Sequence, residues 1–272
     1  MNLSEIIYNS FNEGAKAKPE RTEVTFAPSY LSKCGRAIAY GKLGYEPTNP
    51  PDLPALLKMG WGDILHDDIQ QRLVKAGVME SFEEFKTIEH EGLTFNYFYD
   101  GIVSENGVRW IIEIKTVYSS GYKAIEERPK EEHVLQCLSY MIFEKIDRAI
   151  ILYAGRDNGY LKQHYLELHD DLNGSARLLV GGADYGHLAM WKEKVEKMKR
   201  IKAQVEKKEL PDRDYSIVLK NTNGEIATEF VKDKEKLKSD WQCLYCSHYS
   251  LCWANELEEI KKHKFYINNK FS

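Results

Sequence analysis

Hydrophobic positions along the chain follow helical spacing in some segments and strand spacing in others. Within one segment Leu65, Ile69 and Leu73 recur every four residues, which is the spacing of one helix face. Helical patterns cover residues 55–77, 130–145 and 177 to about 208. Strand-like runs bounded by turn signals cover residues 94–118, 149–154 and 160–168. Helices interleaved with strands place the chain in an α/β or α+β class.

The composition changes this picture little. Of the 272 residues, 43% are hydrophobic and 29% are charged, which excludes collagen-like, low-complexity and wholly disordered classes. No apolar run approaches the roughly 20 residues of a membrane span, and no secretory signal is evident, so we expect a cytoplasmic protein without a membrane partner. A net charge of −4 by itself argues against a nucleic-acid partner. Five cysteines, an odd number, favour free thiols or metal ligands over disulfides.

The most informative short segment surrounds Asn106-Gly107, the strongest short-range hairpin signal, because a type I′ turn needs positive φ at both central positions. If these two residues form the loop, Asp100 faces Glu113 across the two strands. Cross-strand partners have Cβ atoms about 4.5–5.5 Å apart. Lys115 lies two residues beyond Glu113 and therefore points to the same face. The sequence thus predicts three converging charged groups.

Two adjacent carboxylates repel each other and need a cation. Mg²⁺ and Mn²⁺ prefer oxygen ligands and are often held by one or two carboxylates, waters and substrate phosphate. Lys115 could then orient or help to deprotonate a water, or stabilise charge on a phosphate. A solvated charge ladder on an exposed sheet face is the alternative, and this short pattern alone leaves both interpretations open.

Two further helical segments carry candidate residues. Gln136 and Tyr140 are one helical turn apart, so together they could bind a phosphate backbone or hold Lys115, although a polar helix surface would look the same. His66 lies between apolar Leu65 and acidic Asp67. A lone histidine is more often structural, but beside two carboxylates its imidazole could complete a metal shell and favour Mn²⁺.

This ordered series resembles the PD-(D/E)xK nuclease superfamily in its RecB-like branch, over roughly residues 28–142. Tyr99 stands where the name-giving pattern has proline. The resemblance implies an α/β fold with a restriction-endonuclease-like core, a central mixed β-sheet flanked by helices. It also implies that Lys115 is the catalytic lysine and that Gln136 and Tyr140 organise the site or touch DNA. The implied metal ligands are His66, Asp100, Glu113 and the Ile114 carbonyl.

Three of the cysteines have metal-ligand spacing: Cys243, Cys246 and Cys252 form C-x2-C-x5-C. A Cys₄ site needs a fourth thiolate. Cys137 lies in an apolar helical run and is expected to be a buried small hydrophobe. Cys34 lies in a polar break before a helix-like run and is the better candidate. Thiolates bind both zinc and iron–sulfur clusters, so the residues alone leave the metal open.

One cysteine near the start and three near the end resemble the iron–sulfur nucleases of the same superfamily, such as the CRISPR-associated adaptation exonucleases and the AddB nuclease domain. The resemblance implies a [4Fe–4S] cluster that closes a C-terminal cysteine-rich lobe onto the N-terminal segment. We expect a single nuclease domain over 1–272, with its core at about 28–208 and the lobe at about 240–272. The implied cluster ligands are Cys34, Cys243, Cys246 and Cys252.

The residues and the resemblance together predict a metal-dependent deoxyribonuclease that uses Mg²⁺ or Mn²⁺. The resemblance alone implies an exonuclease on single-stranded DNA ends. Such an enzyme would serve phage or prokaryotic recombination, repair or DNA processing. A flap or branch endonuclease and a non-catalytic DNA-binding protein are the alternatives. No helicase motif is present, so a separate helicase, recombinase or integrase is the expected protein partner. The candidate DNA-binding residues are Arg36, Tyr118, Tyr122 and Lys123.

Overall fold

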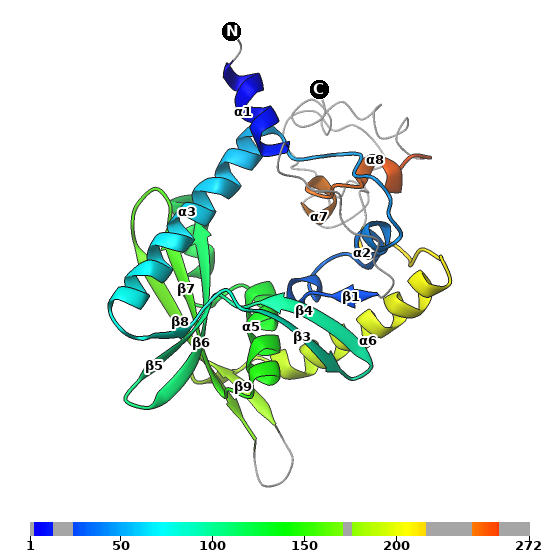
Figure 1. Cartoon of the computed structure of the whole chain (residues 1–272). Helices are drawn as coiled ribbons and strands as arrows, with labels where there is room; N and C mark the ends of the chain where they lie inside the picture. The colour runs from blue at the N-terminus through cyan, green and yellow to red at the C-terminus, as the bar shows by residue number, and fades with distance from the viewer. Residues whose placement is uncertain (1–2, 13–23, 171–175, 216–240, 256–272) are drawn as a thin grey trace, which may run out of the picture. The chain divides into compact units, whose positions relative to one another are not determined.

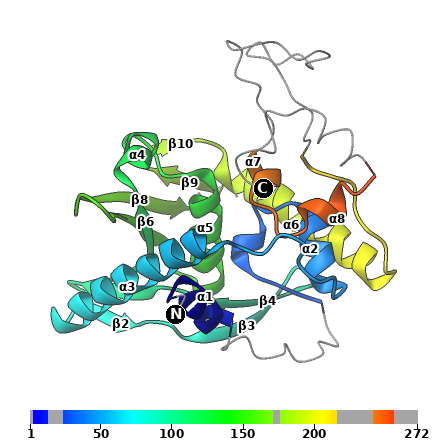
Figure 2. The ribbon, with the colours of Figure 1, turned by 90° about the horizontal axis from the view of Figure 1, so that it is seen from above.

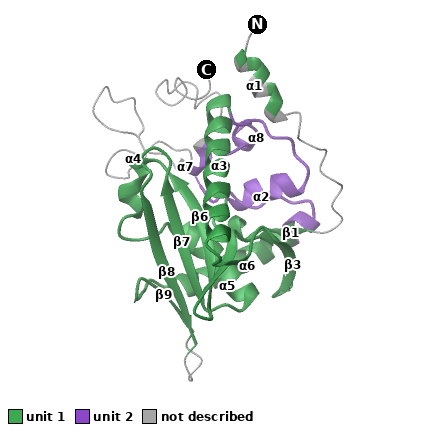
Figure 3. Ribbon diagram, turned by 60° about the vertical axis from the view of Figure 1, so that its left-hand side comes forward, with its two compact units in different colours: residues 1–33, 52–202 green, residues 34–51, 203–272 purple. Residues whose placement is uncertain are grey.

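The computed structural model describes residues 3–12, 24–170, 176–215 and 241–255. The chain divides into two compact units, one made of residues 1–33 and 52–202 and the other of residues 34–51 and 203–272 (Figure 3). Among the described helices, none combines the length and apolarity that a membrane crossing requires. The predicted lobe at 240–272 is described only as far as Asn255, so the predicted domain boundaries stay a prediction.

A seven-stranded mixed sheet forms the centre of the first unit (Figure 1). Its strand order is β10-β9-β8-β7-β6-β5-β2, and all neighbours are antiparallel except β6 and β7, which are parallel. The strands are β2 (Met79–Ser81), β5 (Gly101–Glu105), β6 (Val108–Val117), β7 (Arg148–Gly155), β8 (Leu161–His169), β9 (Arg177–Val180) and β10 (Ala183–Asp184).

A smaller three-stranded sheet of the same unit has the order β1-β4-β3, and its β3 and β4 run side by side (Figure 2). Its strands are β1 (Thr25–Phe26), β3 (Phe85–His90) and β4 (Leu93–Phe98). The helical elements that lie wholly in this unit are α1 (Leu3–Asn12), η1 (Pro28–Tyr30), α3 (Leu53–Lys75), α4 (Ser119–Tyr122), η2 (Lys123–Ile125) and α5 (Glu131–Glu144). Helix α6 (His187–Glu206) begins in the first unit and ends in the second.

The predicted helix face is confirmed in α3. Leu65, Ile69 and Leu73 pack against Ile112 and Ile114 of the central strand β6. The side chain of Asp52 caps the start of α3, where it accepts a hydrogen bond from the Ala55 amide at 2.8 Å. This bond satisfies one of the free N–H groups of the first helical turn. The mixed α/β architecture, with a central sheet and flanking helices, is therefore as expected, and α5 and the strands of residues 94–118, 149–154 and 160–168 are also confirmed.

The predicted helix from residue 177 is wrong for its first ten residues. Residues 177–180 form strand β9, which pairs antiparallel with β8 and buries Leu178 and Val180. Gly181 and Gly182 then adopt positive φ, a conformation that a helix cannot continue through, and α6 begins only at His187. Burial alternates along this short apolar run, as it does in a strand. The run was misread as part of a helical pattern.

The second unit contains α2 (Gly35–Lys42), the last residues of α6 and two four-residue helices, α7 (Trp241–Leu244) and α8 (Tyr249–Cys252). Hydrogen bonds join segments that are far apart in the sequence. The Gly35 amide donates to an Asp214 carboxylate oxygen at 2.6 Å, and the Asn49 amide donates to the Ser247 carbonyl at 2.8 Å. These bonds bring the N-terminal residues of the unit against its C-terminal ones.

Candidate active site and four-cysteine site

The hairpin of β5 and β6 carries the predicted carboxylates in the predicted register. Asn106 and Gly107 have φ of 53° and 78°, and Glu105 pairs with Val108. Counting back, the ladder ends at Gly101 opposite Ile112, so Asp100 stands one residue beyond the last pair. There the carboxylate of Asp100 accepts a hydrogen bond from the amide of Ile114 at 2.5 Å. This contact fixes Asp100 next to the chain of β6.

Glu113 is a buried carboxylate with an unusual environment. Its side chain is fully buried, and among the described residues no group other than Lys115 donates to its oxygens. Burial raises the pKa of Glu113, and the charge of Asp100 raises it further. Its ion-pair partner is the ammonium of Lys115, which contacts Oε1. A fully buried carboxylate whose Oε2 lacks a donor among the described residues is costly in free energy, so this residue fits the role of a cation ligand.

Lys115 keeps its proton in this environment. Burial alone would lower the pKa of its ammonium, but the nearby carboxylates of Glu113 and Asp100 outweigh that effect and raise the pKa. Burial, and to a smaller extent the same positive charge, lowers the pKa of His133 to about 3. Lys115 is therefore a cation at neutral pH, suited to orienting a water or stabilising negative charge.

Helix α3 places His66 over the hairpin. The Nε2 of His66 lies 3.1 Å from Oδ2 of Asp100, and this hydrogen bond raises the pKa of His66. One turn earlier, Gly62 allows the helix to approach closely, because a Cβ there would lie 2.9 Å from the Arg156 guanidinium and 3.0 Å from the Thr116 hydroxyl. Thr116 directly follows Lys115, so the close approach holds the histidine helix against the strand of the candidate catalytic residues.

Two polar residues that the sequence analysis missed, Gln70 and Glu83, also reach this site. Gln70 is only 2% exposed, and its amide donates to the Asp100 carbonyl at 2.7 Å and to Oε1 of Glu83 at 3.2 Å. His66, Glu83 and Asp100 each offer a ligand atom within 4.8 Å of the others, a spacing compatible with a metal ion. Gln70 follows His66 by one helical turn, and that spacing was the available signal.

Gln136 and Tyr140 on α5 contact each other. The Gln136 amide donates to the Tyr140 hydroxyl at 2.8 Å. Tyr140 is buried, and burial raises the pKa of its phenol, with the charge of Glu113 adding to the effect. Tyr140 therefore lies close enough to Glu113 for the charge of that carboxylate to affect the pKa of its phenol. Cys137, between them, is buried in the core as expected.

The four residues expected to bind DNA have varied surroundings. The guanidinium of Arg156 lies over the ring of Tyr118, at 5.3 Å from its centroid. The Tyr122 hydroxyl donates to the Leu161 carbonyl at 3.4 Å, and Lys123 is exposed. In the second unit, Arg36 donates through Nε to the Pro211 carbonyl at 2.7 Å. Their contact with DNA stays a prediction.

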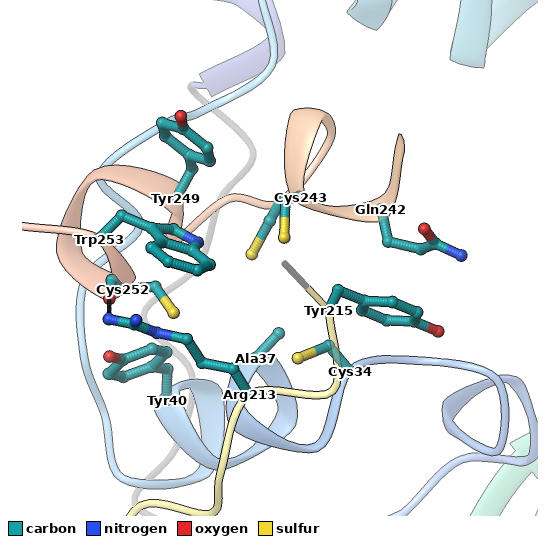
Figure 4. Close-up of a pocket in the computed structure, with 11 residues that line it drawn as sticks. Cys34, Ala37, Tyr40, Arg213, Tyr215, Gln242, Cys243, Tyr249, Cys252 and Trp253 are labelled. Carbon is teal, nitrogen blue, oxygen red and sulfur yellow. Dashed lines mark hydrogen bonds between the residues drawn. The ribbon is translucent and has the colours of Figure 1, made fainter. Parts of the chain in front are cut away.

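The second unit gathers the other four cysteines around one pocket. Cys34, Cys243 and Cys252 direct their sulfur atoms toward a common space (Figure 4). Cys246 lines the same pocket. Burial raises the pKa of the Cys243 thiol to about 12, and the neighbouring cysteines add to the shift. Four thiols that line one space are arranged as the ligands of a metal are.

The wall of this pocket is mostly aromatic and apolar, with Tyr40, Tyr249 and Trp253 among its residues. The guanidinium of Arg213 lies 3.8 Å from the Trp253 ring centroid and donates to the Cys252 carbonyl. Four soft sulfur donors inside an apolar shell suit either a tetrahedral zinc ion or a [4Fe–4S] cluster. The donor set therefore fits the predicted cofactor class.

Comparisons with known proteins gave matches among solved structures alone. No protein-family model and no curated protein matches the chain. The crystal structure of SSO0001 superposes with a TM-score of 0.47 at 16% identity, covering 93% of this chain and 96% of that one. An alkaline exonuclease from Laribacter hongkongensis gives a TM-score of 0.41 at 15% identity, and its complex with dAMP gives 0.43 at 14%. Each of these two covers 67% of this chain and 90% of the exonuclease.

Proposed function

We propose that this chain is a metal-dependent nuclease that hydrolyses phosphodiester bonds of DNA, acting as an exonuclease on single-stranded ends. The observation that carries the proposal is the buried Glu113, whose Oε2 accepts no hydrogen bond from the described residues, beside Asp100 and a protonated Lys115. This combination provides both ligands for a hard cation and a fixed positive charge for a phosphate.

His66, Asp100, Glu113 and the carbonyl of Ile114 would hold a Mg²⁺ or Mn²⁺ ion, and the imidazole of His66 favours Mn²⁺. When bound, the ion would act as a Lewis acid on the phosphate and make a water more acidic. The chain's own residues supply the rest. Lys115 would orient the attacking water and stabilise negative charge that develops on the phosphate.

Gln136 and Tyr140 would support this arrangement from α5. Their mutual hydrogen bond fixes both side chains in one orientation, and the buried phenol of Tyr140 lies near enough to Glu113 to sense its charge. Rigid neighbours of this kind keep catalytic groups within a fraction of an ångström of their working positions. We assign the pair an organising role in catalysis.

The proposed cofactor of the second unit is a [4Fe–4S] cluster on Cys34, Cys243, Cys246 and Cys252, with a structural role. The ligands come from segments near both ends of the sequence, so a shared cluster would strongly restrict the unfolded chain. Protein purified without oxygen should be brown and contain iron and sulfide. A colourless protein with stoichiometric zinc would refute the cluster and leave the ligand set in place.

The function is tested with end-labelled linear single-stranded DNA and a circular single strand of the same sequence. After treatment with a chelator, the protein should cleave neither substrate. Added Mn²⁺ or Mg²⁺ should restore digestion of the linear strand and leave the circle intact, because an exonuclease needs an end. Cleavage of the circle would replace the exonuclease assignment with an endonuclease, and no cleavage of either substrate would refute the nuclease.

A further inference from the structure

Two side chains outside the proposed catalytic set connect the histidine helix to the candidate metal ligands. Gln70 and Glu83 come from α3 and from the segment after β2. Gln70 is a buried amide that donates both to the main chain of Asp100 and to the carboxylate of Glu83. A buried amide in the middle of a helix loses its hydration, so its hydrogen bonds must compensate for that loss. Gln70 therefore ties the Glu83 carboxylate to the backbone of Asp100.

The two ring nitrogens of His66 face different carboxylates. Nε2 lies 3.1 Å from Asp100, on the side of the proposed metal ion, whereas Nδ1 lies 4.0 Å from Oε1 of Glu83. The same Oε1 accepts the hydrogen bond from Gln70 at 3.2 Å. Metal-ligating histidines commonly use one nitrogen for the metal and donate from the other to a carboxylate, which fixes the orientation of the ring.

We propose that Glu83 is a positioning residue of the metal centre. Its carboxylate, 4.0 Å from Nδ1 in this structure, would close to hydrogen-bond distance and orient His66 when Nε2 takes a divalent cation, and Gln70 holds Glu83 in place. This inference rests on the proposed function, because it assumes that the site binds a divalent cation. The fully buried Glu113, whose Oε2 lacks a hydrogen-bond donor among the described residues, separately supports a bound cation beside it.

A second carboxylate near Nδ1 provides a natural control. Asp67 lies 3.9 Å from Nδ1 of His66, as close as Glu83, but its side chain is 75% exposed against 52% for Glu83. Glu83 is also held by its backbone, whose amide donates to the Tyr99 carbonyl at 3.2 Å while φ is 53°. A non-glycine residue rarely adopts that conformation, so the surrounding contacts must hold it there. We therefore assign the positioning role to Glu83 and not to Asp67.

The test is a titration of the full-length, chelator-treated protein with Mn²⁺, followed by electron paramagnetic resonance. Glu83→Ala removes the acceptor and should weaken Mn²⁺ binding about tenfold, the scale typical for loss of an outer carboxylate. Glu83→Gln keeps an oxygen acceptor and should lose less affinity. Asp67→Asn should bind Mn²⁺ like the wild type. A pulsed measurement of the ¹⁴N coupling to Mn²⁺ reports directly on imidazole coordination, which should vanish in His66→Ala and weaken in Glu83→Ala.

The outcomes separate this inference from the proposed function. Wild-type affinity and nitrogen coupling in Glu83→Ala would overturn the positioning role, and so would an equal loss in Asp67→Asn. If Glu83→Ala does not fold, the comparison of Glu83→Gln with Asp67→Asn decides in the same way. If the wild-type protein binds Mn²⁺ with nitrogen coupling but cleaves no DNA, the nuclease function is refuted. The positioning role of Glu83 is then decided by the Mn²⁺ affinities of the variants. A wild type that binds no Mn²⁺ would overturn both.

Discussion

The two candidate sites of this chain are built in opposite ways. The carboxylate site lies on elements that hydrogen-bond to the rest of their unit, because β6 pairs with β5 on one side and β7 on the other, and α3 packs across the sheet. The four-cysteine site is made from the residue before α2, from two helices of four residues and from the turn between those helices. We therefore expect the first site to be in place before an ion binds, and the second to depend on the proposed metal for much of its order.

Helix length explains the difference. Isolated helices shorter than about 12 residues are marginal in water, so α7 and α8 gain little from their own hydrogen bonds. The strand that carries Glu113 and Lys115 has ten residues and ladder partners along most of its length. Removing the divalent ion should therefore abolish the activity of the first unit. Removing the metal of the four-cysteine site should instead destabilise the second unit. The following four experiments address these sites and the contacts around them.

The largest expected effect is on cleavage. Replacing Asp100, Glu113 or Lys115 by alanine should lower the rate of DNA hydrolysis by roughly a thousandfold or more, because a metal ligand or a phosphate-stabilising charge contributes several kcal/mol to the transition state. Thermal unfolding should change little, since the strands persist. Asp68→Asn, which alters an exposed carboxylate paired with Arg72, serves as the control and should keep full activity. Undiminished cleavage by purified Asp100→Ala would refute the assignment.

The second effect is on stability. Cys252→Ser should lose the bound metal and destabilise the second unit by several kcal/mol, because metal binding at such a site contributes to folding free energy. Cys137→Ala is the matched control, since it removes a buried thiol in the first unit and should keep the metal at a cost of about 1 kcal/mol. Metal analysis and limited proteolysis measure the two consequences. Equal metal content in both variants would contradict the four-cysteine site.

A smaller effect is expected where α3 approaches the sheet. Alanine in place of a mid-helix glycine usually stabilises by about 1 kcal/mol, but at Gly62 the new methyl group would meet Arg156 and Thr116. We expect the gain to disappear and the stability to fall by about 1 kcal/mol. Adding Arg156→Ala should relieve part of this loss in a double-mutant cycle followed by chemical denaturation. Additive effects of the two changes would show that the close approach has no energetic consequence.

The smallest effect concerns α5. Tyr140→Phe removes one buried hydrogen bond from Gln136 and should cost about 1 kcal/mol of stability. If the pair organises the site, as proposed, cleavage should slow several-fold, with Mn²⁺ affinity unchanged. A loss as large as that of Lys115→Ala would instead place the phenol in direct contact with the reacting phosphate. Comparison of the rates at saturating Mn²⁺ distinguishes these results.

Local signals in the sequence predicted part of this arrangement well. The Asn106-Gly107 turn fixed the hairpin register because its backbone conformation permits few alternatives, and the spacing of Leu65 and Ile69 gave the buried face of α3. Gln70 and Glu83 were missed for a physical reason. Their roles depend on contacts between α3, the segment after β2 and Asp100, which tertiary packing creates. The one-turn spacing of Gln70 from His66 is the local signal that was passed over.

The β5–β6 hairpin also has a consequence for the order of folding. Its two strands are joined by two residues, so it can form within about 1–10 μs, while the parallel pairing of β6 with β7 must wait for the chain through α5 to close. The facing of Asp100 and Glu113 is thus encoded in a part of the sheet that can form early. Substitutions in the Asn106-Gly107 turn should slow refolding of the sheet more than substitutions in the β6–β7 contact of equal destabilisation.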